Sequence, residues 1–257
     1  MARSILALML LGASAVAQEK GEKTVILVHG AFADGSSWDK VIPLLQAKGL
    51  HVVAVQNPLT SLADDVAATK RAIDAQKGPV ILVGHSWAGT VITEAGASDK
   101  VTSLVYVAAF APDVGESSND VVKGAPPPPG SSSVYADPAG YVYLTPEGVA
   151  HDLAPDLPAA QTKVMAVTQG PIFGKSFDEK VANAAWKAKP SWYIVAEKDR
   201  MIQPDVERAM AKKINAKVTS LPTSHVPMLS RPKDVAAVIL AAAGKSISNV
   251  AASAAKE

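Results

Sequence analysis

A serine at position 86 stands in a setting that suits a nucleophile. The segment Gly84-His-Ser-Trp-Ala-Gly89 follows an apolar run and precedes a helical pattern. In a G-x-S-x-[GA] arrangement, the small residues let the backbone turn sharply between strand and helix, which exposes the serine hydroxyl at the tip. The helix that follows favours negative charge developing beside the serine. The pattern therefore predicts Ser86 as the nucleophile of an acyl-transfer reaction.

A serine nucleophile needs a general base and an acid that orients it, and after such a turn the acid and then the histidine follow along the chain. His225 is the one histidine of five that follows the last predicted strand. Asp199 lies just past the preceding strand and is predicted as the acid. Asp113 and Glu197 also follow strand ends and remain alternatives, although such loop charges are usually solvated.

The loop after the first predicted strand is expected to complete an oxyanion hole. It reads His29-Gly-Ala-Phe32, and the N–H of Ala31 is predicted to act together with that of Trp87. Phe32 is the alternative donor and a candidate substrate-binding side chain. His29 is expected to be structural and to fix the loop by hydrogen bonds, since it lacks the third partner that a general base needs.

These residues must be positioned by a regular framework, and the rest of the chain alternates between two patterns. Short β-rich runs without strict polar alternation suit strands that are buried on both faces of a parallel sheet. Helical stretches lie between them, so the sequence predicts an α/β fold with a doubly wound, mostly parallel sheet. The predicted strands are 23–28, 51–55, 79–83, 101–108, 191–196 and a weaker 216–221, and the predicted helices are about 37–48, 61–77, 87–98, 203–214 and 232–244.

Residues 112–188 interrupt this alternation. They hold ten of the 18 prolines, four of them in succession at 126–129, and show no clear strand. Helical patterns near 146–153 and 158–168 predict a helical cap inserted into a single domain. Apolar side chains of the cap are candidates to line a pocket, with packing among themselves as an equal alternative: Tyr135, Tyr141, Tyr143, Met165, Ile172, Phe173 and Phe177.

Composition excludes several classes of protein. The 257 residues include 25 basic and 24 acidic side chains, and this balance argues against a nucleic-acid partner. The absence of cysteine excludes disulfides, thiolate metal sites and a cysteine nucleophile. The chain has no H-E-x-x-H, P-loop or G-x-G-x-x-G motif, so no metal and no organic cofactor is expected. The sequence carries no indication of the oligomeric state.

The N-terminus has the layout of a secretory signal peptide. A short basic start precedes a seven-residue apolar run, and Ala15-Val-Ala17 is a small-x-small cleavage site. We expect cleavage after Ala17, which leaves one domain over 18–257 in a secreted or periplasmic protein. The apolar run is too short to span a bilayer, so no stable membrane anchor is expected. The alternatives are a frayed apolar N-terminus and a retained anchor.

With these residues placed, the chain resembles the α/β-hydrolase superfamily, and within it the small-capped esterase group that includes plant methylesterases and hydroxynitrile lyases. The resemblance covers about 23–244, although the cap is matched only by position and size. The segments that carry it are Val28-His-Gly-Ala31, Trp38, Leu82-Val-Gly-His-Ser86, Lys198-Asp-Arg-Met-Ile202 and Ser224-His-Val-Pro-Met228.

The resemblance implies that Ser86, Asp199 and His225 form a catalytic triad acting on small or medium apolar esters. Lyases of the group have Thr and Lys at two positions that here hold Gly30 and Val226, which favours ester hydrolysis. Three alternatives remain: another reaction on the same triad, such as hydroxynitrile cleavage or acyl transfer; a ligand-binding module with a slow triad; and a dehalogenase or epoxide hydrolase, which Ser86 disfavours because those enzymes use an aspartate nucleophile.

Overall fold

The molecule is built on a six-stranded parallel sheet. The computed structural model describes residues 22–246, so the predicted signal peptide lies outside the described residues. The strands lie in the order β2-β1-β3-β4-β8-β9, and each pairs in parallel with its neighbours. Their bounds are β1 Thr24–Val28, β2 His51–Val55, β3 Val80–His85, β4 Val101–Val107, β8 Ser191–Ala196 and β9 Lys217–Leu221.

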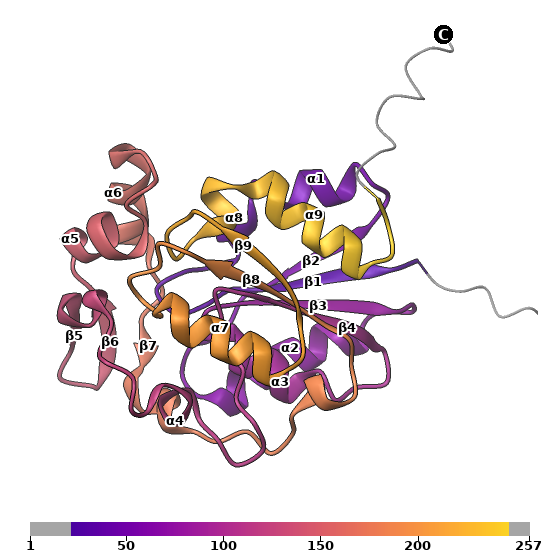
Figure 1. Ribbon diagram of the computed structural model, residues 1–257, viewed down its shortest axis with the longest axis horizontal. Coiled ribbons are helices and arrows are strands. Elements are labelled where there is room, and N and C mark those ends of the chain that lie inside the picture. The colour runs from indigo at the N-terminus through magenta and orange to yellow at the C-terminus, as the bar shows by residue number, and fades with distance from the viewer. Residues whose placement is uncertain (1–21, 247–257) are drawn as a thin grey trace, which may run out of the picture.

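Helices cover both faces of this sheet. In Figure 1, α1, α8 and α9 lie on one side of the strands, and α2, α3 and α7 lie on the other. This is the doubly wound α/β fold that the sequence predicts. The bounds are α1 Ile42–Gln46, α2 Leu62–Asp74, α3 Ala88–Ala95, α7 Pro204–Lys213, α8 Pro227–Ser230 and α9 Pro232–Ala242.

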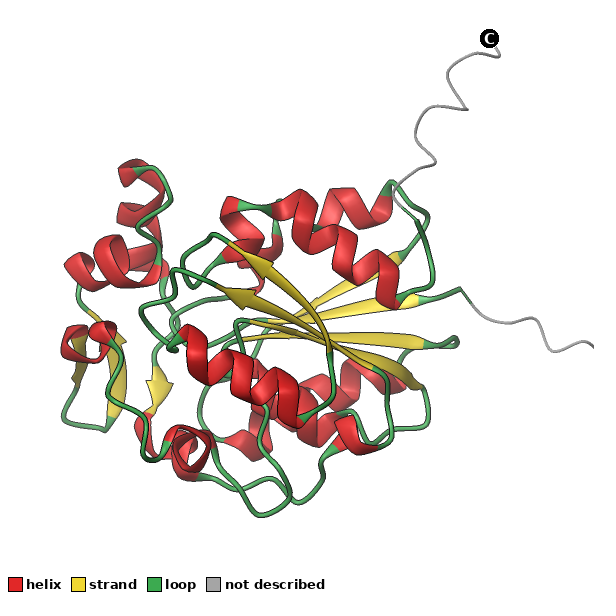
Figure 2. Ribbon diagram, in the orientation of Figure 1, coloured by secondary structure: helices red, strands yellow, loops and turns green. Residues whose placement is uncertain are grey.

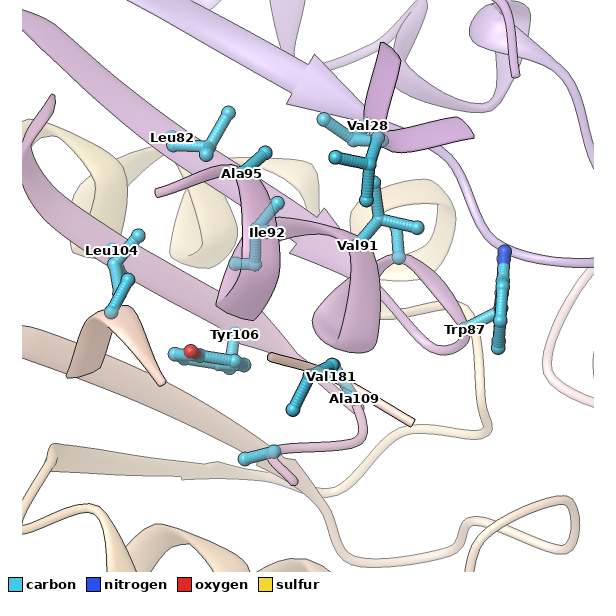
Figure 3. Close-up of a cluster of buried hydrophobic side chains, with 14 of the residues drawn as sticks. Val28, Leu82, Trp87, Val91, Ile92, Ala95, Leu104, Tyr106, Ala109 and Val181 are labelled. Atoms are coloured by element: carbon cyan, nitrogen blue, oxygen red, sulfur yellow. The ribbon is translucent and has the colours of Figure 1, made fainter. Parts of the chain in front are cut away.

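Side chains alternate along each strand, so the sheet supports two separate cores. Ile26 and Leu82 point into the core beneath α3, whereas Val25 and Ile81 point into the core beneath α9. Figure 3 shows the first of these cores, where the helix α3 lies against side chains of β3 and β4. Its labelled residues are Val28, Leu82, Trp87, Val91, Ile92, Ala95, Leu104, Tyr106, Ala109 and Val181.

One predicted helix is divided. Instead of a helix over 37–48, the chain forms a 3₁₀ turn, η1 Gly35–Trp38, and then the short helix α1. Pro43 explains the break, because a residue without a backbone N–H is tolerated only in the first turn of a helix, and there it stands in α1. The turn buries Trp38 completely.

The cap contains strands that the sequence analysis did not predict. Besides its helical segments, a three-stranded antiparallel sheet joins β5 Val134–Ala136, β6 Tyr141–Leu144 and β7 Ile172–Phe173. Each strand is at most four residues long, which is too short for a pattern of alternating polarity to stand out. The other cap elements are α4 Ser118–Val122, η2 Pro129–Ser133, α5 Pro146–Gly148, the π-helix η3 Val149–Leu153, α6 Ala159–Thr168, η4 Gly174–Asp178 and η5 Ala185–Lys187.

The cap lies beyond the carboxyl ends of the strands. Figure 2 shows α5, α6 and the small sheet set to the side toward which the arrowheads of β8 and β9 point. In open α/β sheets, the loops at this edge form the ligand site. Within residues 22–246, no helix has the length and apolarity needed to cross a bilayer.

Candidate active site

The turn between β3 and α3 holds Ser86 in a conformation that few side chains adopt. Its φ of 53° lies in the left-handed region, and such strain in a non-glycine residue often marks a functional site. Two glycines permit the close packing around the turn. A Cβ on Gly84 would lie 2.6 Å from the Ala88 carbonyl oxygen, and one on Gly30 would lie 2.8 Å from Ser86 Cβ. The loop after β1 therefore packs directly against the serine.

Ser86, His225 and Asp199 form one row of hydrogen bonds. Ser86 Oγ lies 2.8 Å from His225 Nε2, and His225 Nδ1 lies 2.5 Å from Asp199 Oδ2. The second oxygen of Asp199 accepts hydrogen bonds from the N–H groups of Met201 at 2.6 Å and Ile202 at 2.8 Å. With its Nδ1 proton directed at the carboxylate, the imidazole presents Nε2 as an acceptor to the serine hydroxyl.

The acid of this row is ionised although it is buried. Burial raises the pKa of Asp199, but the His225 ring and the hydrogen bonds to the carboxylate outweigh this effect and lower the pKa below its usual value. Glu207 of α7 is the opposite case. Its burial, and next the charge of Asp199, raise the pKa of Glu207 well above its usual value, which favours the protonated form. One Glu207 oxygen accepts from the N–H of Ala196 at the end of β8.

The histidine loop is also held from the neighbouring turn. Nε2–H of His85, the residue before the serine, donates to the carbonyl oxygen of His225 at 2.8 Å. Burial, and next the neighbouring His225, lower the pKa of His85 to about 3, so this ring is neutral.

His29 fixes the loop after β1, as the sequence predicts. It donates from Nδ1 to the Gly30 carbonyl oxygen, and its Nε2 accepts from the N–H of Asn57, both at 2.9 Å.

Of the two amides considered for the loop after β1, one is already used. The N–H of Phe32 donates to the Gly170 carbonyl oxygen at 3.0 Å, which favours the Ala31 amide over that of Phe32 as an oxyanion donor.

Trp87, the other predicted oxyanion donor, forms the N-terminal boundary of α3. Its indole N–H donates to Asp65 Oδ2 at 2.8 Å, and this carboxylate is completely buried in α2.

A pocket of about 250 Å³ opens at Ser86 and His225. No charged side chain lines it, and all lining side chains except those of Ser86, Ser131 and His225 are apolar. Phe32 is among the lining residues, and of the seven proposed cap side chains only Phe177 is. The lining residues are Ala31, Phe32, Ser86, Phe110, Pro128, Ser131, Val134, Val142, Gly174, Phe177, Met201, Ile202 and His225.

Most other cap candidates pack against one another. Tyr135 stacks on Tyr143, and Tyr141 lies against Phe173 with ring centroids 5.5 Å apart. The packing alternative was thus the correct one for these four rings.

The two alternative acids lie elsewhere. Asp113 forms an ion pair with Lys187, and Glu197 forms one with Arg208. Neither contacts His225, whose ring is paired with Asp199. Among the described residues, no group of three or more His, Cys, Asp or Glu side chains is arranged to hold a metal ion.

Comparison with known proteins extends these observations. The model of the alpha/beta hydrolase family matches residues 25–238. A probable hydrolase of Phoma sp. is 29% identical in an alignment that covers 86% of this chain and 98% of that protein. Methylesterase 2 of Arabidopsis thaliana is 26% identical, over 89% of this chain and 98% of its own. The crystal structure of a pyrethroid hydrolase matches with a TM-score of 0.77 at 24% identity, over 87% of this chain and 98% of that one, which is a likeness of fold.

Proposed function

Because the chain belongs to the alpha/beta hydrolase family, we propose that it is a serine hydrolase that cleaves carboxylic esters of small or medium apolar substrates. The observation that carries this proposal is the unbroken row of hydrogen bonds from Ser86 through His225 to Asp199 at the wall of an apolar pocket. The similarity to a methylesterase supports an ester as the substrate.

The proposed reaction assigns one role to each side chain. His225 Nε2 takes the proton of Ser86 as the hydroxyl oxygen attacks the ester carbonyl carbon, and Asp199 stabilises the imidazolium that forms. The amides of Ala31 and Trp87 bind the oxyanion. His225 then protonates the departing alcohol, and a water molecule hydrolyses the acyl-enzyme by the same steps in reverse roles.

The pocket limits the acyl group. A volume of about 250 Å³ corresponds to roughly eight water molecules of liquid. An uncharged lining offers no partner to a charged acyl group, and burying an unpaired charge is strongly unfavourable. Short and medium neutral acyl chains therefore fit this site best.

A turnover screen tests the proposal. The purified protein is assayed with p-nitrophenyl acetate, butyrate and dodecanoate, and we expect clear turnover of the two shorter esters with a decline for the longest. Ser86→Ala should abolish turnover, whereas Ser132→Ala, a serine on the cap that bonds only to the Pro129 carbonyl oxygen, should not.

Covalent labelling separates this mechanism from the alternatives. A fluorophosphonate should add one label to the wild-type protein and none to Ser86→Ala. Labelling that survives this substitution would contradict the assignment of the nucleophile. Stoichiometric binding of an ester without steady-state turnover would instead favour a ligand-binding module.

A further inference from the structure

Two carboxylates of one short cap segment hold residues that adjoin the triad in the sequence. Asp152 lies in the π-helix η3, and its Oδ1 accepts from Arg200 Nε at 2.8 Å. Arg200 directly follows Asp199. Asp156 lies three residues after η3 and accepts twice from Ser224, from the backbone N–H at 2.9 Å and from the hydroxyl at 2.5 Å.

The contact at Arg200 involves the backbone as well as the side chain. The N–H of Gly130, at the start of the cap turn η2, donates to the Arg200 carbonyl oxygen at 2.8 Å. A Cβ on Gly130 would lie 2.5 Å from the Met201 sulfur. Only a glycine therefore fits at this contact between the cap and the loop that follows Asp199. The second oxygen of Asp152 accepts from the Ser133 hydroxyl at 2.6 Å, which ties this carboxylate to the cap itself.

The contact at Ser224 joins a buried residue to an exposed carboxylate. Ser224 is buried and directly precedes His225, whereas Asp156 lies at the surface. Asp156 satisfies both hydrogen-bond donors of Ser224, so a buried N–H and a buried hydroxyl lose their partners together when this carboxylate is removed. The position of the segment before the base therefore depends on a side chain of the cap.

Neither carboxylate lines the catalytic pocket. We propose that Asp152 and Asp156 are positioning residues. Asp152 holds Arg200, which follows Asp199, and Asp156 holds Ser224, which precedes His225. The cap segment 152–156 thereby keeps the carboxylate of Asp199 aligned with the ring of His225. The proposal rests on the roles assigned to the triad above. Displacements of about 1 Å can cost roughly 100-fold in rate when reacting groups must be aligned. Removal of a contact in this segment should therefore lower kcat and leave KM almost unchanged.

The central test compares Asp156→Ala with its conservative counterpart. For Asp156→Ala we expect kcat for p-nitrophenyl butyrate and the rate constant of fluorophosphonate labelling to fall about 10- to 100-fold, within the range of small misalignments. Asp156→Asn should recover most of this loss, because an amide can both accept from the Ser224 N–H and donate to its hydroxyl oxygen. Ser224→Ala removes one of the two bonds and should give a smaller loss.

Asp137→Ala is the matched control. Asp137 is a cap carboxylate that accepts from the N–H groups of Ala139 and Tyr141 and so bonds only within the cap hairpin. We expect this variant to keep the wild-type kcat. Asp152→Ala should lower kcat as Asp156→Ala does. A rise in KM at unchanged kcat, wild-type kcat in Asp156→Ala, or the same loss in Asp137→Ala would overturn the proposal.

A spectroscopic measurement decides the proposal without turnover. The proton between His225 Nδ1 and Asp199 Oδ2, which are 2.5 Å apart, should give a low-field ¹H NMR resonance. We expect this resonance to weaken or shift in Asp156→Ala and to persist in Asp156→Asn and Asp137→Ala. If wild-type protein neither turned over esters nor took the label, the proposed function would fail, and an unaltered resonance in Asp156→Ala would separately contradict the positioning role.

Discussion

The indole N–H of Trp87 donates a hydrogen bond of 2.8 Å to the buried carboxylate of Asp65. The other oxygen of Asp65 accepts from the N–H of Leu59 at 2.8 Å. Burial, which is only partly offset by these hydrogen bonds, raises the pKa of Asp65 from 3.8 to about 6. The residue beside the nucleophile is therefore held by a carboxyl group whose pKa is about 6.

This pKa predicts how stability depends on pH. The folded protein binds the Asp65 proton more tightly than the unfolded chain, so the stabilisation is fully present below pH 3.8 and is lost as the pH rises through about 6. At 1.36 kcal/mol per pKa unit, the loss is about 3 kcal/mol. Asp65→Asn does not titrate. Its free energy of unfolding, measured in urea, should therefore rise relative to wild type by about 2 kcal/mol between pH 4 and pH 7.5, because part of the effect is already lost at pH 4.

Asp64→Asn is the control for this measurement. Hydrogen bonds from Thr60 and Ser61 lower the pKa of the neighbouring Asp64. The contribution of Asp64 to the stability of the fold therefore grows as the pH rises, whereas that of Asp65 falls. A difference between wild type and Asp65→Asn that stays constant from pH 4 to pH 7.5 would contradict the prediction.

The choice of Asp199 over Asp113 leads to a second prediction. Removal of the acid's charge in another serine triad lowered kcat about 10⁴-fold, and Asp199→Asn should cause a loss of similar size because the amide favours the wrong histidine tautomer. Asp113→Asn removes only a partly exposed ion pair with Lys187 and should stay near wild type. Steady-state kcat is measured for both variants. If kcat fell in Asp113→Asn and not in Asp199→Asn, the catalytic acid would instead be Asp113, which lies in the loop after β4.

The elements that position the triad were predictable because each strand has a local apolar pattern, and the carboxyl ends of parallel strands meet at one edge of the sheet. Strands β3 and β8 are mainly apolar runs. Ser86 directly follows the first and Asp199 lies three residues past the end of the second, so the sequence located both side chains at the same sheet edge. His225 followed from chain order in the same way. The divided helix at Pro43 and the short strands of the cap were missed, because their patterns extend over too few residues.

The supporting carboxyl groups could not be found from the sequence. Asp65 and Glu207 lie within predicted helices, where an isolated acid usually belongs to the solvated face. Nothing in their spacing distinguishes them from Asp64 or Asp205, and only the packing of α2 and α7 against the sheet shows that both are fully buried. The contact of Asp156 with Ser224 joins positions 68 residues apart, which no local pattern records.

Glu207 provides a third prediction. The raised pKa favours the protonated form of Glu207. Glu207→Gln preserves the shape of that form and an acceptor for the Ala196 N–H, so kcat at pH 7 should be near wild type. The raised pKa means that the stabilisation by Glu207 is present below its usual pKa and is lost as the pH rises through the folded value. Gln does not titrate, so the stability of Glu207→Gln relative to wild type should increase with pH.

Glu207→Ala is the contrasting variant. It removes the acceptor of a buried N–H, which costs about 1–3 kcal/mol, and this loss should appear at every pH. If Glu207→Gln were as destabilised as Glu207→Ala at pH 7, the side chain would instead be ionised in the folded protein.

The proposed export of the protein is tested at its N-terminus. Mass spectrometry of the protein from its native host should find Gln18 as the first residue, because the small-x-small site ends at Ala17. An intact Met1 in a soluble cytoplasmic fraction would contradict the signal peptide. An intact N-terminus in the membrane fraction would indicate a retained anchor.

The last prediction separates hydrolysis from lyase chemistry on the same triad, and the charge near the base decides it. A cyanohydrin-cleaving site must stabilise cyanide as it departs, which a cation beside the histidine would do. Val226 stands directly after His225, and no charged side chain lines the pocket. Lys198 precedes the buried Asp199 but is itself exposed, and the Arg200 side chain is paired with Asp152.

We therefore expect turnover of p-nitrophenyl butyrate and no release of cyanide from mandelonitrile above the uncatalysed rate. An alcohol leaves as a neutral molecule once His225 protonates it, so an uncharged pocket suffices for the ester and not for the cyanohydrin. Both substrates are assayed with wild type and with Ser86→Ala, because only cleavage that depends on the serine reports on this site. Efficient cyanide release with negligible ester turnover would show that the triad geometry is correct and that the reaction assigned to it is not.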